Sequence, residues 1–302
     1  MRIFMTGGTG FVGTAMTRAL TGKGFQVSIL TRSAKKKPSD SPLIRYVEGD
    51  PVQPGSWQEE VGGHDVVANL AGASIFTRWT AEAKEEIRNS RILTTRNVVE
   101  ALSMGKSPGR FLFSASAIGF YGPRGEETVD ETSDPGNDFL SMLSQEWEAE
   151  ALRAQQFGVR VTPARFGIVL GKGGGALSQM ASIFKKGLGG PLGDGKQWFS
   201  WVHIQDLAQI LLFLIDHQEI SGPTNCTAPN QVRNAELTKT LASVLHRPAI
   251  FRVPAFMVKI AMGEFGSVLL TGQRVAPRKL QEAGYEFSYP ALRPALENIF
   301  ES

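Results

Sequence analysis

Short apolar runs alternate with amphipathic stretches through the first half of the chain, and this alternation predicts its elements. Strands are expected at Arg2–Thr6, Gln26–Leu30, Ile44–Val47, Asp65–Leu70, Arg110–Ser114 and Val159–Phe166. Apolar residues recur at helical spacing in Phe11–Thr21, Thr80–Ser103 and Asp138–Phe157. Strands that alternate with helices favour a parallel sheet with helices on both faces. The sequence therefore predicts an α/β, Rossmann-type doubly wound sheet that binds ligands at the carboxyl ends of its strands.

The pattern changes after residue 170. Glycine-rich loops at 171–175 and 187–195 flank a short helical stretch, and Ile204–Asp216 reads as a helix that returns to the sheet. The later elements are shorter: a helix at Asn234–Leu245, a strand at Ala249–Val253 and a helix opened by Pro254.

Two structural units are expected from this change. The Rossmann domain would comprise residues 1–170 plus about 204–225. A smaller, mixed α/β lobe for substrate would comprise about 171–203 plus 226–302.

Composition narrows the class of protein. The chain has 302 residues, 42% of them hydrophobic, which is ordinary for a globular protein with a large core. The net charge is +3 and the basic residues are mixed with acids, so no nucleic-acid partner is expected. The single cysteine excludes an internal disulfide, and the four scattered histidines predict no metal site.

No apolar stretch suggests a membrane segment. The longest apolar run, Ile210–Ile215, falls far short of the ~20 residues that span a bilayer. No basic amphipathic helix stands out, and no leader-like segment opens the chain. We expect a cytoplasmic protein without a membrane partner.

The segment between the first strand and the first helix carries the clearest motif. Residues 6–13 read TGGTGFVG, with Gly7, Gly10 and Gly13 three apart. The early glycines allow a tight turn and a close approach of the backbone to a pyrophosphate, and the last allows the helix to pack on the strand. The helix N-terminus offers free N–H groups and a partial positive charge to phosphates. This segment predicts a dinucleotide site.

The end of the second strand favours NADP over NAD. An NAD site usually has an acidic residue there to hold the ribose 2′-hydroxyl. Here Arg32 stands at that place, followed by Lys35, Lys36 and Lys37. A guanidinium suits a 2′-phosphate. Alternatively, Arg32 and the three lysines form a solvated basic loop that does not contact the cofactor.

Several further segments, read together, resemble one family. They are Gly49–Asp50, Asn69–Gly72, Phe113–Ala117 with Tyr121–Gly122, Pro163–Gly167 and Trp201–Leu207. Over essentially its whole length the chain resembles the extended short-chain dehydrogenases/reductases, which include nucleotide-sugar epimerases. Trp147–Ala149 and Gly189–Gly193 resemble its atypical branch, called simply epimerase family proteins. The glycine loop, Arg32 and the resemblance together give the expected cofactor contacts: Gly7, Thr9, Gly10, Phe11, Val12, Gly13, Arg32, Asp50, Leu70, Ala71, Gly72, Ser114 and Arg165.

One departure from the family concerns catalysis. The family uses a tyrosine as acid or base, with a lysine four residues later that lowers its pKa. None of the four tyrosines here is followed by lysine at that spacing. Phe139 and Leu143 occupy the corresponding positions, and neither can move a proton.

Three titratable or hydroxyl residues remain as candidates. Ser116 resembles the family's catalytic serine, or else it bonds the backbone at a strand end. Tyr121 is a candidate acid, or a half-buried aromatic residue that packs on the cofactor. His203 has a suitable ordinary pKa, although this position resembles one that caps a helix. Trp198, Trp201 and His203 are expected to line a substrate pocket.

Two functions stay open. The first is an NADP-dependent oxidoreductase or epimerase-like enzyme that acts on a small or sugar-like substrate. The second is a non-catalytic NADP-binding sensor that keeps the glycine loop without the Tyr–Lys pair. Either would be a monomer or a homodimer.

Overall fold

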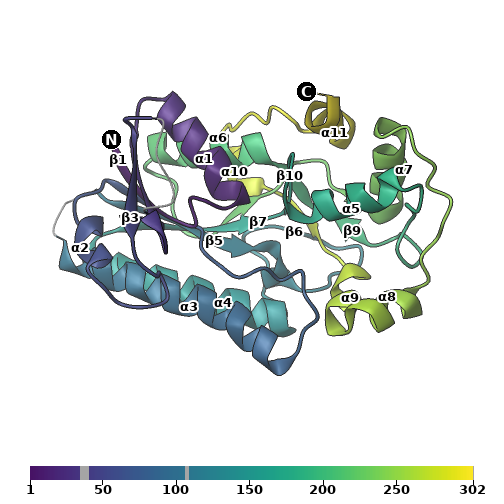
Figure 1. Cartoon of the computed structure of the whole chain (residues 1–302), viewed down its shortest axis with the longest axis horizontal. Coiled ribbons are helices and arrows are strands. Elements are labelled where there is room, and N and C mark those ends of the chain that lie inside the picture. The colour runs from purple at the N-terminus through teal and green to yellow at the C-terminus, as the bar shows by residue number, and fades with distance from the viewer. Residues whose placement is uncertain (35–40, 106–108, 302) are drawn as a thin grey trace.

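A single parallel sheet forms the centre of the molecule (Figure 1). The computed structural model describes residues 1–34, 41–105 and 109–301. Across the sheet, the seven strands are β11 (Thr224–Cys226), β7 (Arg160–Phe166), β5 (Phe111–Ala117), β4 (Val66–Asn69), β1 (Arg2–Thr6), β2 (Gln26–Thr31) and β3 (Ile44–Glu48). All six pairings are parallel. The chain winds outward in both directions from β1, which confirms the doubly wound prediction and puts the switch point beside β1.

Helices cover both faces of this sheet (Figure 1). One face carries α1 (Phe11–Gly22) and α6 (Ile204–Asp216), and the other carries α2 (Trp57–Val61), α3 (Ala81–Met104) and α4 (Phe139–Leu152). Ile3 and Met5 of β1 pack with the α1 and α6 side chains, whereas Phe4 faces the α3 side. The strand is buried on both faces, which explains its continuous apolar sequence.

The second region has its own core. Helices α5 (Gly175–Lys185), α7 (Asn234–Val244) and α11 (Leu292–Glu301) pack around Trp201 and Phe184. Two separate pairs of short strands accompany this region: β8 (Ile168–Leu170) pairs with β10 (Trp201–His203), and β9 (Trp198–Phe199) with β12 (Val232–Arg233).

The C-terminal segment returns to the first half of the chain. It holds α8 (Ala255–Met262), α9 (Glu264–Leu269) and α10 (Arg278–Glu282), and its β13 (Arg274–Val275) pairs with β6 (Thr128–Val129). Phe265 of α9 is buried beside Trp79. Leu280 of α10 is fully buried in the core between the sheet and α6, where Tyr285 and Phe287 also pack. This segment is therefore part of the packing of the Rossmann sheet.

Some expected elements are confirmed and others are wrong. Thr80 caps α3, since its hydroxyl accepts a hydrogen bond from the Ala83 N–H at 3.2 Å. The helix expected at 138–157 ends at Leu152 and continues as the 3₁₀ turn η3 (Arg153–Phe157); a second such turn, η2 (Ile118–Tyr121), follows β5. The strand expected at 249–253 is absent, because only Val253 forms a bridge, to Leu192, and its apolar neighbours lie on the surface.

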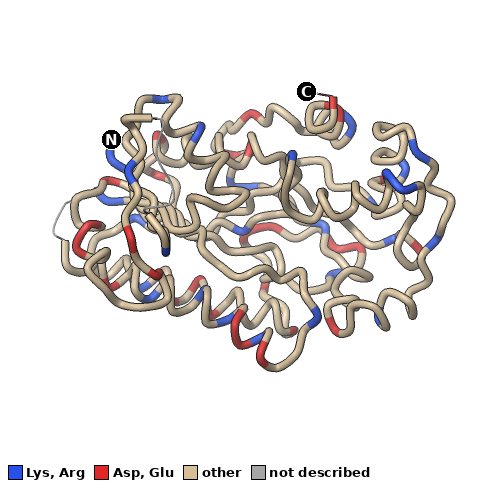
Figure 2. Tube along the Cα trace, viewed as in Figure 1, with Lys and Arg blue, Asp and Glu red and all other residues tan. Residues whose placement is uncertain are grey.

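Charged residues of both signs are interspersed along the trace (Figure 2). Among the described residues, no helix is both long and apolar enough to cross a bilayer. The same residues contain no group of three His, Cys, Asp or Glu side chains placed to hold a metal ion.

Candidate functional site

The glycine loop lies at the carboxyl edge of the sheet, between β1 and α1. Gly7 has a φ of +66°, and a Cβ added there would lie 2.7 Å from the backbone carbon of Leu70. A Cβ on Gly13 would lie 2.2 Å from the carbonyl oxygen of Gly7. Neither distance leaves room for a side chain, so these glycines are required for the loop to pack against α1 and the end of β4.

The N-terminus of α1 is open to a ligand. Gly10 is the N-cap, and within the described part of the chain no side chain is hydrogen-bonded to the first N–H groups of the helix. The Gly10 N–H itself turns back to the Gly7 carbonyl at 2.9 Å. Thr9 and Gly10 are exposed, whereas Val12 is half-buried. This arrangement leaves donors and the positive end of the helix dipole free for an anion.

Phe11 opens α1 and forms a contact with the second region. A Cβ on Gly174 would lie 2.3 Å from the Phe11 ring, and one on Gly171 would lie 2.9 Å from it. The ring therefore rests against the glycine-rich loop 171–175, which joins the dinucleotide loop to the region expected to bind substrate.

Arg32 lies immediately after β2, with its side chain exposed. The Gly49 N–H donates to the Thr31 carbonyl at 3.0 Å, which holds the ends of β2 and β3 together. Asp50 follows, and its carboxylate accepts from the Val52 N–H at 3.1 Å. Arg32 has no acidic partner among the described residues. The lysines at 35–37 lie outside the described residues.

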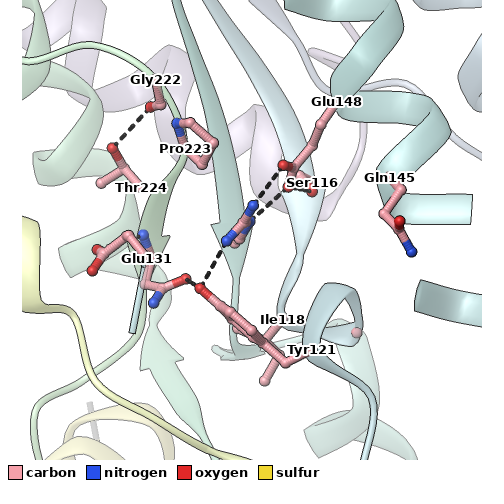
Figure 3. A network of polar contacts seen from close by, with 12 residues as sticks. Ser116, Ile118, Tyr121, Glu131, Gln145, Glu148, Gly222, Pro223 and Thr224 are labelled. Carbon is pink, nitrogen blue, oxygen red and sulfur yellow. Dashed lines mark hydrogen bonds and ion pairs between the residues drawn. The ribbon is translucent and has the colours of Figure 1, made fainter. Parts of the chain in front are cut away.

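A buried polar network crosses the ends of β5 and β7 (Figure 3). Arg165 donates from Nε and Nη2 to the two carboxylate oxygens of Glu148, at 2.7 and 2.8 Å. The Ser116 hydroxyl donates to the same carboxylate at 2.6 Å. On its other side Arg165 donates to the Tyr121 hydroxyl at 2.9 Å, and that hydroxyl donates to Asn225 at 2.7 Å. Every member is buried, so the network ties β5, β7, α4 and β11 together.

This network sets the chemistry of the two catalytic candidates. Burial raises the pKa of Tyr121 to about 12, although the Arg165 charge opposes the shift. Tyr121 is completely buried, more so than the half-buried residue expected as the alternative, and its hydroxyl is hydrogen-bonded on both sides. The Ser116 proton is directed to Glu148.

Two expected cofactor contacts are also internal. Arg165 is 3% exposed and paired with Glu148. Ser114 is fully buried, and its hydroxyl accepts from the Asn69 amide at 3.3 Å. Asn69 in turn accepts from Thr6, whose hydroxyl receives the Leu70 and Ala71 N–H groups. These bonds shape the edge of the sheet behind the glycine loop.

The three expected pocket residues do not share one environment. Trp201 is fully buried in the second core, and its indole N–H donates to the Asn230 carbonyl at 3.1 Å. His203 is the N-cap of α6, where its Nδ1 accepts from the Gln205 N–H at 3.2 Å. Burial lowers the pKa of His203 to about 4. Trp198 is half-buried beneath two guanidinium groups, of Arg233 at 3.7 Å and Arg274 at 4.7 Å from its ring.

An aromatic cluster occupies the place of the family's Tyr–Lys pair. Phe139 and Leu143 belong to it, with Trp79, Trp147 and Phe265. The Trp79 and Phe139 rings meet edge to face at 5.1 Å. Apolar packing therefore surrounds Phe139 and Leu143, and neither side chain can donate a proton.

Two charged residues of the site were missed from the sequence. Glu148 is one of three glutamates at alternate positions of α4, and nothing in the local sequence shows that it, rather than Glu146 or Glu150, reaches Ser116 and Arg165. Arg91 lies on the inward face of α3, against Gly72 at the end of β4. The available signal was a cation with no acidic residue one helical turn away in either direction.

Comparison with known proteins gives matches over most of the chain. Residues 3–226 match the model of the NAD dependent epimerase/dehydratase family, and residues 253–299 match a domain of unknown function, DUF1731. A chloroplastic SDR39U1 homolog of Arabidopsis thaliana, described as an epimerase family protein, is 40% identical over 303 residues, covering all of this chain and 87% of the relative. The epimerase family protein YfhF of Bacillus subtilis is 40% identical over 301 residues, covering 99% and 98%.

Solved structures resemble the whole chain as well. Human epimerase family protein SDR39U1, crystallised with NADPH, superposes with a TM-score of 0.88 at 34% identity, covering all of this chain and 99% of that one. UDP-glucose 4-epimerase of Thermus thermophilus, in complex with NAD, gives a TM-score of 0.80 at 19% identity and shares the fold.

Proposed function

The chain belongs to the NAD-dependent epimerase/dehydratase family, and from that premise we propose that it is an NADP(H)-dependent enzyme of the oxidoreductase or epimerase-like type. The observation that carries the proposal is the uncapped N-terminus of α1 at the switch point of the sheet, lined by glycines whose Cβ atoms would clash. That cradle fits the pyrophosphate of a dinucleotide. The bound nicotinamide would supply or accept a hydride.

Arg32 would select the phosphorylated cofactor. Its exposed guanidinium follows β2, where an NAD site would carry a carboxylate. The human structure that resembles this chain was crystallised with NADPH, which supports the same choice. A charge-assisted contact to the 2′-phosphate is worth about 1.5–3 kcal/mol, or roughly 10- to 100-fold in affinity.

Substituting the arginine tests this selection. In Arg32→Asp, the ratio of the Kd values for NADPH and NADH, measured by calorimetry, should reverse in favour of NADH. Arg18→Asp makes the same charge change at an exposed position further along α1 and should leave the ratio unaltered. A ratio that is the same in Arg32→Asp and the parent protein would refute the assignment.

The remaining expected cofactor contacts belong to the same proposal. Thr9 to Gly13, with Leu70, Ala71 and Gly72, would surround the pyrophosphate, and Asp50 would lie toward the adenine. Ser114 and Arg165 would support the site indirectly, because their hydrogen bonds fix the ends of the strands next to the glycine loop.

A proton donor is the open requirement of the chemistry. Of the two candidates we favour Ser116, because among the described residues its hydroxyl has one hydrogen-bond partner, Glu148, whereas the Tyr121 hydroxyl is engaged on both sides. Loss of a positioned acid or base typically costs 10²–10⁴-fold in rate, so we expect slow turnover.

The second candidate function is a non-catalytic NADP(H) sensor. The observation that favours it is the apolar pair Phe139 and Leu143 at the positions of the family's proton-transfer pair. One experiment separates the two functions: NADPH consumption is followed by absorbance with aldehydes, ketones and quinones. Turnover that disappears in Ser116→Ala supports the enzyme. Micromolar or tighter NADPH binding without any turnover supports the sensor.

Substrate would bind between the dinucleotide loop and the second region, where Trp198 is the most accessible of the expected pocket residues. We keep the expected division of the chain as a proposal about ligands: residues 1–170 plus about 204–225 for the cofactor, and the rest for the substrate. Leu280, Tyr285 and Phe287 of the second part nevertheless pack in the core of the Rossmann sheet. We also propose that the protein is located in the cytoplasm and is a monomer or a homodimer.

A further inference from the structure

Arg91 occupies an unusual position on α3, beside the edge of the sheet that carries the glycine loop. A Cβ on Gly72 would lie 3.2 Å from its Cζ and 3.4 Å from its Nη1, so the guanidinium lies directly against the Gly72 backbone. Gly72 follows Leu70 and Ala71, whose backbones lie against Gly7. The guanidinium is thus separated from the dinucleotide loop by one short stretch of backbone.

Three contacts hold this geometry. Arg91 Nη1 donates to the Ile87 carbonyl one turn back at 2.9 Å. Its Cζ lies 5.2 Å from the centre of the Trp147 ring. The neighbouring Ser90 hydroxyl accepts from the Ala73 N–H at 2.9 Å, which fixes the loop after β4 on α3. The guanidinium is therefore positioned before any ligand arrives.

The charge of Arg91 is uncompensated. Other arginines of α3 are paired: Arg88 with Glu146 and Arg96 with Glu150. Arg91 has no carboxylate partner within the described parts of the chain, and there its Nε and Nη2 have no acceptor. Burial without a counter-charge lowers its pKa to about 10, so it remains a cation at neutral pH. The side chain is half-buried, which leaves it reachable from solvent.

We propose that Arg91 is an anion-binding residue that holds a phosphate or carboxylate group of a ligand beside Gly72. A planar guanidinium with free donors suits both groups, and the missing carboxylate is the partner that the ligand would supply. The inference rests on the proposed function only in placing the ligand at the same edge of the sheet. The anion has two possible sources: the pyrophosphate of the cofactor, or an acidic group on the substrate.

Arg91→Met is the informative variant, because it removes the charge and keeps an unbranched stem over Trp147. Arg88→Met is the matched control, since it removes an exposed arginine, paired with Glu146, that lies three residues earlier on the same helix. Calorimetry with NADPH, NADH and inorganic pyrophosphate, and with phosphate and benzoate in the presence of NADPH, gives the readout. We expect at least one of these ligands to bind roughly 10- to 100-fold more weakly to Arg91→Met and to be unaffected in Arg88→Met.

The pattern of losses identifies the source. Equal loss for NADPH, NADH and pyrophosphate indicates the cofactor, whereas unchanged cofactor binding with loss of phosphate or benzoate indicates the substrate. If the parent protein bound no dinucleotide, the proposed function would fail, and the pyrophosphate and phosphate measurements would still decide the role of Arg91.

A stability measurement separates this role from a structural one. Without ligand, Arg91→Met should unfold at the same or a higher urea concentration than the parent, because an unpaired charge has been removed. Arg91→Lys should recover part of the anion binding. Unchanged binding of all five ligands to Arg91→Met would overturn the proposal, as would a lower urea midpoint without weaker binding.

Discussion

Replacing Glu148 with leucine isolates the buried charge of Arg165. The change removes the acceptors of two Arg165 hydrogen bonds, at 2.7 and 2.8 Å, and the acceptor of the Ser116 hydroxyl. The two side chains of the ion pair are only 3% and 5% exposed, so water cannot take the place of the carboxylate. Breaking a buried pair by removing one partner costs about 3–5 kcal/mol, and we expect the free energy of unfolding of Glu148→Leu to fall by this amount.

The double variant Glu148→Leu/Arg165→Met should recover much of that loss. Replacing both charges by apolar groups of similar volume is often neutral, because the cost of desolvating each charge disappears with it. The coupling free energy of the double-mutant cycle should therefore reach about 2 kcal/mol. Glu146→Leu is the control: it breaks the exposed pair with Arg88 and should cost less than about 1 kcal/mol.

Urea denaturation at pH 7, followed by circular dichroism, measures all of these free energies. A loss below about 1 kcal/mol in Glu148→Leu would contradict the reasoning, because it would mean that the Arg165 charge finds another partner or reaches solvent. A double variant that is as unstable as the sum of its singles would show that the two residues act independently.

Two further predictions concern pH and the glycine loop. Burial lowers the pKa of His203 from 6.5 to about 4, so between these pH values the unfolded chain binds a proton that the folded chain does not. Between pH 7 and pH 4 the free energy of unfolding of the parent protein should therefore fall by roughly 3 kcal/mol more than that of His203→Asn. Equal changes in the two proteins, measured by urea unfolding, would contradict this. Gly13→Ala would put a Cβ 2.2 Å from the Gly7 carbonyl oxygen, whereas a Cβ on Gly22, at the other end of α1, meets nothing within 4 Å. The affinity for NADPH, measured by calorimetry, should therefore fall at least about tenfold in Gly13→Ala and stay unchanged in Gly22→Ala. Equal affinities in the two variants would show that the loop tolerates the side chain.

The sheet could be predicted largely from the sequence, because each of its central strands is a buried apolar run bounded by helical segments. β11 was missed because Thr224, Asn225 and Cys226 form a short polar run without apolar alternation. Pairing with β7 alone makes it a strand. The strand expected at 249–253 failed for the converse reason: its apolar residues face solvent, with Ile250 77% exposed.

The site, like the sheet, has one part that the sequence alone identifies and one part that it does not. The glycine loop is a local motif whose turn, cap and helix lie within a few residues, so sequence alone identifies it. The Glu148 partner of Ser116, and the Gly72 backbone and Trp147 ring beside Arg91, are brought there by tertiary packing. Glu148 reaches Ser116 from 32 positions away, and nothing in the local sequence distinguishes it from the exposed Glu146. Only the fold shows that Ser116 has a carboxylate beside it.

The packing of the C-terminal segment in the Rossmann core has a consequence for how the two segments of the chain evolve. Leu280, Tyr285 and Phe287 fill a core whose other walls come from β1, α1 and α6, and Phe265 completes the cluster around Trp79. A chain cut before residue 253 would leave both cores open and present apolar surface to proteases and chaperones. The two segments that match separate family models therefore share one interior, and we expect selection to act on that interior rather than on two exchangeable modules.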